Sequence, residues 1–189
     1  MKLKYYLKKF WHFLKEDTWQ SWLVSIILII LLIKYILFPF LSLVTGSPLP
    51  LVVVESCSMY QESRFNEWWE KNAAWYEEAN IEKDEFEEFP FKRGLNKGDI
   101  ILVTKKENYE VGDIIIFQAP TRHPIIHRVI ENDPISTKGD HNTNQLSFER
   151  DISEDVIIGK ATAKIPFLGW VKLIFFEFIQ PQSQRGFCK

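Results

Sequence analysis

The sequence predicts a mainly β domain of antiparallel strands, preceded by one N-terminal transmembrane helix and interrupted by an inserted helical segment. Three observations predict this fold class: a long apolar run near the N-terminus, an acidic and aromatic stretch, and a later series of short β-branched runs. We expect the parts to be a basic N-terminus at 1–19, an anchor at 20–44, a domain at 45–166 with an insertion at 62–91, and an apolar segment and tail at 167–189.

The anchor is predicted by its length and its lack of charge. Residues 21–44 carry only one charged side chain, Lys34. About 20 apolar residues in a helix cross roughly 30 Å of hydrocarbon, and this run provides them. Trp19 and Trp22 lie where aromatic belts form at the membrane surface. We expect Lys34 to extend towards the outer headgroups; a polar contact with a partner helix is the alternative.

The orientation of the anchor follows from the lysines that precede it, which are Lys2, Lys4, Lys8, Lys9 and Lys15. Positive charge favours the cytoplasmic side, so everything after about residue 45 is expected outside. A cleaved signal peptide is the competing interpretation. Its apolar core usually has about 7–15 residues, which this run exceeds, so we expect a permanent anchor.

The acidic stretch at 62–91 has its aromatic residues at helical spacing, namely Phe65, Trp68, Trp69, Trp75 and Tyr76. This spacing traces one face of a helix. We expect that face to pack on the domain. A lid or docking surface is the alternative. The acidity of the stretch disfavours close contact with anionic lipid headgroups.

The β domain is predicted from short β-branched runs between Gly, Pro and Asn residues, at 98–104, 111–120, 124–132 and 156–165. Two of these runs begin with Gly-Asp, which predicts antiparallel neighbours that each start after a tight turn. The last apolar stretch, "FLGWVKLIFFEFIQ" at 167–180, is too short to span a membrane comfortably. We expect an interfacial or core-packing helix there, with a second membrane crossing as the alternative.

The composition narrows the possible functions. The formal net charge of −2 disfavours a nucleic-acid-binding protein, which normally has a basic face. Cys57 and Cys188 are the only cysteines and lie far apart in the sequence, so we expect core burial rather than a disulfide framework to support folding. The redox compartment stays open at this point.

The chemistry-bearing residues begin in "VVVESCSMYQ" at 52–61. If the strand continues, Ser56 and Ser58 share one face and Cys57 lies on the other. Two such serines line a cleft or, more commonly, belong to a turn. His127 shares a strand face with apolar residues in "PIIHRVI". This position fits either a buried core histidine or a general base. Asp140 follows Gly139 in a turn that can point a carboxylate towards an imidazole.

A metal site is disfavoured by spacing. His123 and His127 are four residues apart on one predicted strand, which separates them by roughly 13 Å at about 3.3 Å per residue. They cannot both reach a zinc ion at about 2 Å unless the strand breaks at Pro124. We expect neither a metal nor any other cofactor.

In order along the chain, "SCSM" after the anchor, then "GDIIIF" and "PIIHRVI", then "TKGD" resemble the signature boxes of the signal peptidase I family. They are most similar to its archaeal and endoplasmic-reticulum branch, over the anchor and most of residues 51–165. The resemblance implies an antiparallel β catalytic domain against the outer membrane face. It implies Ser58 as the nucleophile, Ser56 in the oxyanion hole, His127 as the base where bacterial members have lysine, and Asp140 as the orienting acid.

The chain departs from the family pattern at two positions that matter for chemistry. Gln61 stands where the family usually has proline. Many archaeal and eukaryotic members also have a second aspartate about six residues after the turn aspartate, and here that neighbourhood holds no acid. Glu149 and Asp151 are therefore alternatives to Asp140 as the third member of the triad.

The resemblance implies a serine endopeptidase of the cell membrane, single-pass, that removes signal peptides from exported preproteins. Its expected partners are preprotein substrates and the lipid bilayer, with a translocon or accessory subunits as further candidates and no nucleic acid. The main alternative is a catalytically inactive, membrane-anchored relative that binds preproteins or a translocon. A Cys57 nucleophile is a lesser alternative because its predicted strand face is opposite to that of the serines.

Overall fold

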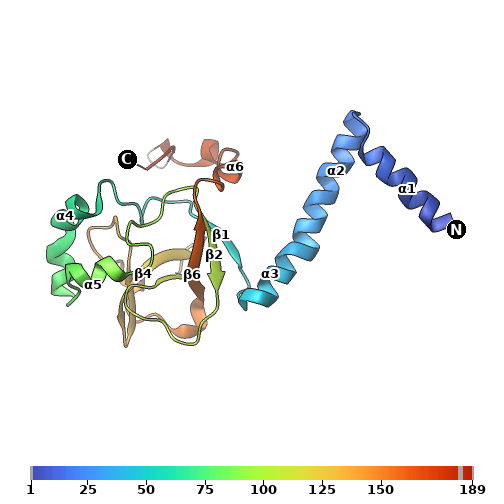
Figure 1. Cartoon of the computed structure of the whole chain (residues 1–189). Helices are drawn as coiled ribbons and strands as arrows, with labels where there is room; N and C mark the ends of the chain where they lie inside the picture. Colours follow the sequence, from blue (N-terminus) through green and yellow to red (C-terminus); the bar gives the residue numbers. More distant parts are fainter. Residues whose placement is uncertain (1, 183–184, 189) are drawn as a thin grey trace. The chain divides into compact units, whose positions relative to one another are not determined.

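The computed structural model describes residues 2–182 and 185–188, which divide after Val44 into two compact units (Figure 1). The helices of the first unit and its end are α1 Lys2–Leu14, α2 Trp19–Leu32, the π-helix Ile33–Leu37 and α3 Phe38–Thr45. The strands are β1 Leu51–Val53, β2 Ile100–Thr104, β3 Ile114–Phe117, β4 Ile125–Asn132, β5 Ile135–Lys138 and β6 Ile157–Ile165. The remaining helical segments are α4 Phe65–Glu78, α5 Lys83–Glu88, α6 Trp170–Leu173 and the 3₁₀ turns Ser147–Glu149, Glu154–Val156 and Glu177–Ile179.

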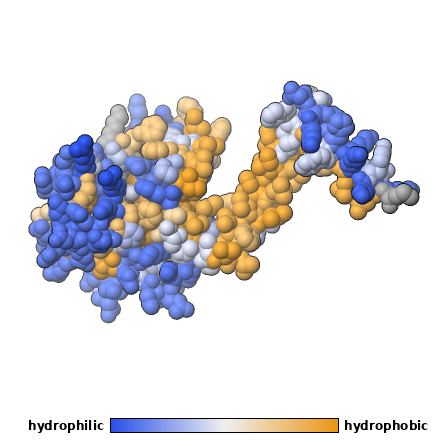
Figure 2. Space-filling view, in the orientation of Figure 1, coloured by the Kyte–Doolittle hydropathy of each residue, from blue (hydrophilic) through white to orange (hydrophobic). Residues whose placement is uncertain are grey.

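Among the described residues, one helix is long and apolar enough to cross a membrane, and it runs over 27 residues from Trp19 to Thr45. Thr18 caps its start, because the Thr18 Oγ1 accepts from the Ser21 N–H at 3.3 Å. The π-helix ends at Leu37, two residues before Pro39, which has no N–H to donate to the preceding helical turn. Its wider turn accommodates that missing bond without ending the helix. The apolar side chains along the span are exposed (Figure 2).

The second unit is built on a six-stranded sheet in the order β1-β2-β6-β3-β4-β5, in which each neighbouring pair is antiparallel. The predicted fold class, a mainly β domain with an N-terminal apolar helix and additional helices, is confirmed. β5 was not predicted as a strand. It pairs with β4 from Arg128 opposite Lys138 to Asn132 opposite Ile135, and this pairing brings the end of β5 close to the middle of β4.

Two Gly-Asp sequences start strands β2 and β3 in the same way, as expected. Asp99 accepts from the Asn96 N–H at 2.9 Å and Asp113 accepts from the Glu110 N–H at 3.2 Å. The prediction that these two strands are neighbours is wrong, because β6 lies between them and pairs with both. The turn is a local signal, whereas the strand partner is β6, a segment that begins 40 residues after the end of β3.

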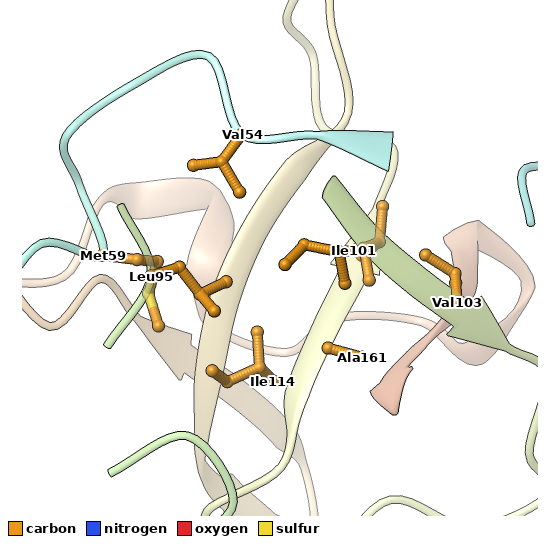
Figure 3. Close-up of a cluster of buried hydrophobic side chains, with 8 residues drawn as sticks. Val54, Met59, Leu95, Ile101, Val103, Ile114 and Ala161 are labelled. Carbon is orange, nitrogen blue, oxygen red and sulfur yellow. The ribbon is translucent and has the colours of Figure 1, made fainter. Parts of the chain in front are cut away.

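One apolar cluster joins the segment after β1 to strands β2, β3 and β6 (Figure 3). Its buried members are Val54, Met59, Leu95, Ile101, Val103, Ile114, Ile116 and Ala161. Burying a large aliphatic side chain stabilises a fold by about 1.5–3 kcal/mol. Because Met59 directly follows Ser58, this cluster fixes the backbone beside the two serines.

The insertion forms two helices, α4 and α5, rather than one. The break follows α4 at Asn80, which has a φ of 60°. The aromatic face packs inward as predicted, in a cluster of Trp68, Trp69, Tyr76, Ile81, Phe86 and Ile130. Ile130 belongs to β4, so the insertion covers the same strand that carries His127. The glutamates of the outer face point to solvent, and this part of the surface is hydrophilic in Figure 2.

Candidate active site

The two serines lie in a turn that follows β1, and not on the strand itself. β1 ends at Val53, so Ser56 and Ser58 do not continue its face, and of the two interpretations it is the turn that the structure shows. The turn nevertheless brings them together, with the Ser56 Oγ and the Ser58 Oγ 3.1 Å apart. The next residue, Met59, is buried, and its carbonyl accepts from the Leu95 N–H at 2.8 Å. The backbone of the turn that carries both hydroxyls is therefore fixed by the burial and hydrogen bonding of Met59.

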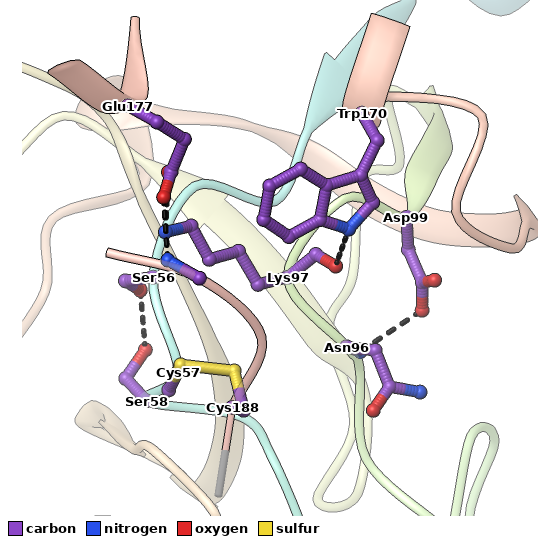
Figure 4. The surroundings of a disulfide bond; sticks show 10 residues. Ser56, Cys57, Ser58, Asn96, Lys97, Asp99, Trp170, Glu177 and Cys188 are labelled. Atoms are coloured by element: carbon purple, nitrogen blue, oxygen red, sulfur yellow. Dashed lines mark hydrogen bonds and ion pairs between the residues drawn. A yellow bond between two sulfur atoms is a disulfide. The ribbon is translucent and has the colours of Figure 1, made fainter. Parts of the chain in front are cut away.

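Cys57, which lies between the two serines, forms a disulfide with Cys188 (Figure 4). Nothing in the sequence indicated this pairing. The two cysteines are 131 residues apart in the sequence, but their Cα atoms are 5.6 Å apart, a distance typical of a disulfide. The disulfide also removes the Cys57 alternative, because a cysteine nucleophile must be a free thiolate.

The C-terminal segment is fastened beside this turn by a second set of contacts (Figure 4). The Trp170 indole N–H donates to the Lys97 carbonyl at 3.1 Å, and the Lys97 Nζ lies 2.6 Å from the Glu177 Oε1. Gly98 permits this approach: its φ is +90°, and a Cβ there would meet the Trp170 ring at 2.2 Å. On the exposed side, Lys172 pairs with Glu55 at 2.8 Å.

His127 lies on β4, is 3% exposed, and contacts a carboxylate with one ring nitrogen. Its Nδ1 hydrogen-bonds the Oε1 of Glu149, a residue that is fully buried. Glu149 is itself held by the Leu146 N–H, which donates to Oε2 at 2.6 Å, and by the Thr137 hydroxyl, which donates to Oε1 at 3.4 Å. Donation of the Nδ1 proton to Glu149 leaves Nε2 as the basic nitrogen.

The free nitrogen of His127 faces the turn of residues 138–141, which we term the Gly139 turn. A Cβ on Gly139 would lie 2.8 Å from the His127 Nε2 and 2.6 Å from the Ser58 carbonyl oxygen. The His141 N–H donates to that same Ser58 carbonyl at 2.9 Å. Glycine is therefore required here, because the base and the nucleophile's backbone both contact this one residue.

Asp140 is buried, and its carboxylate is held by Arg128 rather than by the His127 imidazole. The Arg128 Nε donates to its Oδ1 at 2.9 Å and the Arg128 Nη2 donates to its Oδ2 at 2.8 Å. Both residues are fully buried, so the two charges compensate each other in a low-dielectric site. Gln61 adds a further bond, from its Nε2 to Asp140 Oδ2 at 3.3 Å.

Sequence reasoning missed Arg128, although the strand contained a signal for it. An arginine inside "PIIHRVI" stands among residues that the sheet buries, and a buried arginine needs a carboxylate partner. Its pairing with Asp140 leaves Glu149 as the carboxylate at the imidazole. The other alternative, Asp151, is exposed.

Lys138 is a further charged residue of this region, and it is 1% exposed. Its Nζ donates to the Gly139 carbonyl at 3.1 Å. Burial lowers the pKa of Lys138 to about 8, although the nearby carboxylates Asp140 and Glu149 act in the opposite direction. Lys138 therefore carries a charge that its surroundings stabilise only in part.

Among the described residues, no group of three or more His, Cys, Asp or Glu side chains is placed to hold a metal ion. His123 is exposed at the end of the loop before β4, while His127 is buried within that strand. The polar groups of this region are instead the paired hydroxyls of Ser56 and Ser58 and the hydrogen-bonded imidazole and carboxylate of His127 and Glu149. Such a set suits acyl transfer, in which a base activates a hydroxyl and then protonates the leaving group.

No family model matches the sequence. Several curated proteins are similar to it, and those that we report bear the name signal peptidase complex catalytic subunit SEC11. The protein of Colletotrichum graminicola is 27% identical over 166 residues, covering 79% of this chain and 77% of the relative. The proteins of Komagataella phaffii and Dictyostelium discoideum are each 28% identical over shorter alignments, which cover 44% of this chain and 60% and 55% of those relatives.

Proposed function

Because the chain belongs to the signal peptidase I family, in its endoplasmic-reticulum-type branch, we propose that it is a membrane-bound serine endopeptidase that removes N-terminal signal peptides from preproteins. One observation supports this most strongly. The His127 imidazole is held at Nδ1 by a buried carboxylate while Nε2 faces the turn that binds the Ser58 carbonyl. A carboxylate at one imidazole nitrogen, with the serine-bearing turn near the other, supports acyl transfer by Ser58.

In the proposed reaction, Ser58 Oγ attacks the carbonyl carbon of the scissile peptide bond and its proton moves to His127 Nε2. The resulting oxyanion is stabilised by the Ser58 N–H and by the Ser56 hydroxyl, whose oxygen lies 3.1 Å from the Ser58 Oγ. His127 then gives the proton to the departing amine, and the peptide C–N bond breaks. Water repeats the sequence on the acyl-enzyme and releases Ser58.

We assign the orienting carboxylate to Glu149 and give Asp140 a different task. Glu149 fixes the tautomer of His127 and stabilises the imidazolium that forms during attack. Asp140, paired with Arg128, holds the Gly139 turn against Ser58. The sequence expectation for Asp140 was a direct contact with the base, whereas this assignment makes Asp140 a positioning residue.

The membrane location is supported by three features of the chain. The apolar helix Trp19–Thr45 is long enough to span, and the lysines before it favour a cytoplasmic N-terminus. The Cys57–Cys188 disulfide favours an oxidising compartment for the β domain. We therefore propose a single-pass protein of the cell membrane with its catalytic domain on the extracytoplasmic side.

The partners are proposed from the names of the relatives, which are catalytic subunits of a signal peptidase complex. The chain acts on preproteins and works with accessory subunits or a translocon. A further partner is the lipid bilayer, which the C-terminal segment would contact through its exposed apolar side chains. Its large apolar side chains are exposed (Figure 2), namely Phe167, Leu168, Val171, Ile174, Phe175, Phe176, Phe178 and Ile179. We propose that this segment lies at the membrane interface.

The decisive experiment reconstitutes the full-length protein in lipid and follows the cleavage of a radiolabelled preprotein by the wild type and by Ser58→Ala. Cleavage at one site by the wild type alone supports the peptidase. A correctly folded wild type that does not cleave, even with added membrane extract, favours the inactive preprotein-binding relative. Cleavage by both proteins points to a contaminating protease and removes the assignment of Ser58.

A further inference from the structure

We propose that the insertion, residues 62–91, positions the Gly139 turn for catalysis, with Trp75 and Tyr76 as its positioning residues. This inference rests on the proposed peptidase activity, and it gives a task to a segment that the family resemblance leaves without one. The inner face of the insertion contacts charged residues on both sides of Gly139, in addition to packing its aromatic rings together.

The first contact is with Lys138, the residue before Gly139. The Lys138 Nζ lies 4.8 Å from the centroid of the Trp75 ring and 4.9 Å from that of Tyr76. A cation over an aromatic face within about 6 Å is attracted by the electron density of the ring. Two rings from consecutive residues of α4 therefore hold the amine of a buried lysine.

The second contact is with Asp140, the residue after Gly139. The Tyr76 hydroxyl donates to the Asp140 Oδ1 at 3.4 Å. Burial, followed by the Asp140 charge, raises the pKa of Tyr76 well above its ordinary value, so this hydroxyl keeps its proton and remains a donor. Tyr76 thus contacts both neighbours of Gly139, one with its ring and the other with its hydroxyl.

The third contact passes through Arg128. Its guanidinium lies 4.8 Å from the centroid of Phe86 in α5, and its Nη1 and Nη2 donate to the carbonyls of Pro90 and Phe91 at 2.9 and 3.0 Å. The remaining N–H groups donate to Asp140 and to the Gly112 carbonyl. All five donors of an arginine are therefore used, and the end of the insertion is tied directly to the partner of Asp140.

Two of the residues that the insertion contacts are the direct neighbours of Gly139, which itself lies next to the reacting groups. Gly139 lies against the His127 Nε2 and the Ser58 carbonyl, and the His141 N–H donates to that carbonyl. A shift of the Gly139 turn therefore changes the distance between nucleophile and base. Because a misplacement of about 1 Å can cost roughly 100-fold in rate, loose packing by the insertion reduces turnover before it unfolds the domain.

The test compares Tyr76→Leu with Phe65→Leu in the reconstituted full-length protein. Both replace an aromatic ring of α4 that packs on Trp68, Trp69 and Phe86. Of the two, Tyr76 is the one that also contacts Lys138 and Asp140. For Tyr76→Leu we expect kcat to fall by about tenfold with KM within about twofold, because substrate contacts are kept. Phe65→Leu is expected to lower Tm while leaving kcat within about twofold. Tyr76→Phe, which keeps the ring over Lys138, should restore most of the turnover.

A second measurement does not depend on cleavage. Hydrogen exchange of the His141 amide reports its bond to the Ser58 carbonyl, and we expect it to accelerate at least tenfold in Tyr76→Leu and to stay unchanged in Phe65→Leu. If the wild type never cleaves, the proposed function fails while this measurement still tests the positioning. Equal exchange in both variants, or a loss of kcat that simply follows Tm in both, would overturn the inference.

Discussion

The two sides of the candidate site are held in contrasting ways. On the nucleophile side, Ser56 is exposed and Ser58 is half-buried, and their turn is secured by a disulfide and a surface ion pair. On the base side, His127, Glu149, Arg128 and Asp140 are all buried, and each of the two carboxylates is hydrogen-bonded to its neighbour, Glu149 to His127 and Asp140 to Arg128. A peptidase needs a nucleophile that a polypeptide can reach and a base whose tautomer does not change. The difference shows that accessibility and pre-organisation are provided by separate elements.

The largest effect should come from the carboxylate on the base side. Glu149→Gln keeps the size and an acceptor but removes the charge that holds the Nδ1 proton. We expect kcat to fall by up to about 10⁴-fold, the loss seen when a triad carboxylate becomes an amide, with Tm nearly unchanged. The matched control is Glu154→Gln, an exposed glutamate of the following 3₁₀ turn. If Asp140→Asn instead produces the large loss of kcat at unchanged Tm, the assignment of Glu149 is wrong.

Breaking the buried ion pair should mainly destabilise the fold. Arg128→Met leaves Asp140 charged and without its main partner, which costs about 3–5 kcal/mol of folding free energy. The double variant Arg128→Met with Asp140→Leu should recover part of this loss because no unpaired charge remains. Chemical denaturation in detergent measures both variants. Equal stability of the single and double variants would show that the cost is lost packing alone.

Removing the disulfide tests how far the nucleophile side depends on its crosslink. For Cys57→Ala with Cys188→Ala, we expect a loss of about 2–5 kcal/mol, since the bond closes a loop across 131 residues. Turnover should fall as well, because Ser56 and Ser58 flank the freed position. Reductant should reproduce these changes in the wild type and leave the double variant unaffected, and a response of the double variant would locate the effect elsewhere.

Lys138 makes the base side sensitive to pH. Its pKa is about 8 in the folded protein and 10.5 in its ordinary state, so the unfolded chain binds more protons between these values. Stability should therefore rise with pH over that window, by about 3 kcal/mol at most. Lys138→Met should remove this rise and be more stable than the wild type near pH 7. Denaturation midpoints from pH 7 to 10 measure the difference, and parallel curves for the two proteins would contradict it.

The smallest effect is expected for the surface ion pair of the nucleophile side. Glu55 and Lys172 are 34% and 52% exposed, and pairs of this kind contribute about 0–1 kcal/mol. Glu55→Gln should change Tm by about 4 °C or less and leave turnover unaltered, measured by thermal unfolding and preprotein cleavage. A large loss of activity would mean that this pair, rather than the disulfide, holds the turn.

The sequence by itself determined the features that depend on neighbouring residues. The apolar length of 21–44, the strand runs, the aromatic face of α4 and the Gly-Asp turns are all local signals, and the order of the short motifs pointed to the family. The structure adds what depends on contacts between distant segments: the Cys57–Cys188 crosslink, the strand β6 between β2 and β3, and the placement of Glu149 rather than Asp140 at His127. Residue spacing limits which side chains share a face, but only the folded chain decides which buried charge finds which partner.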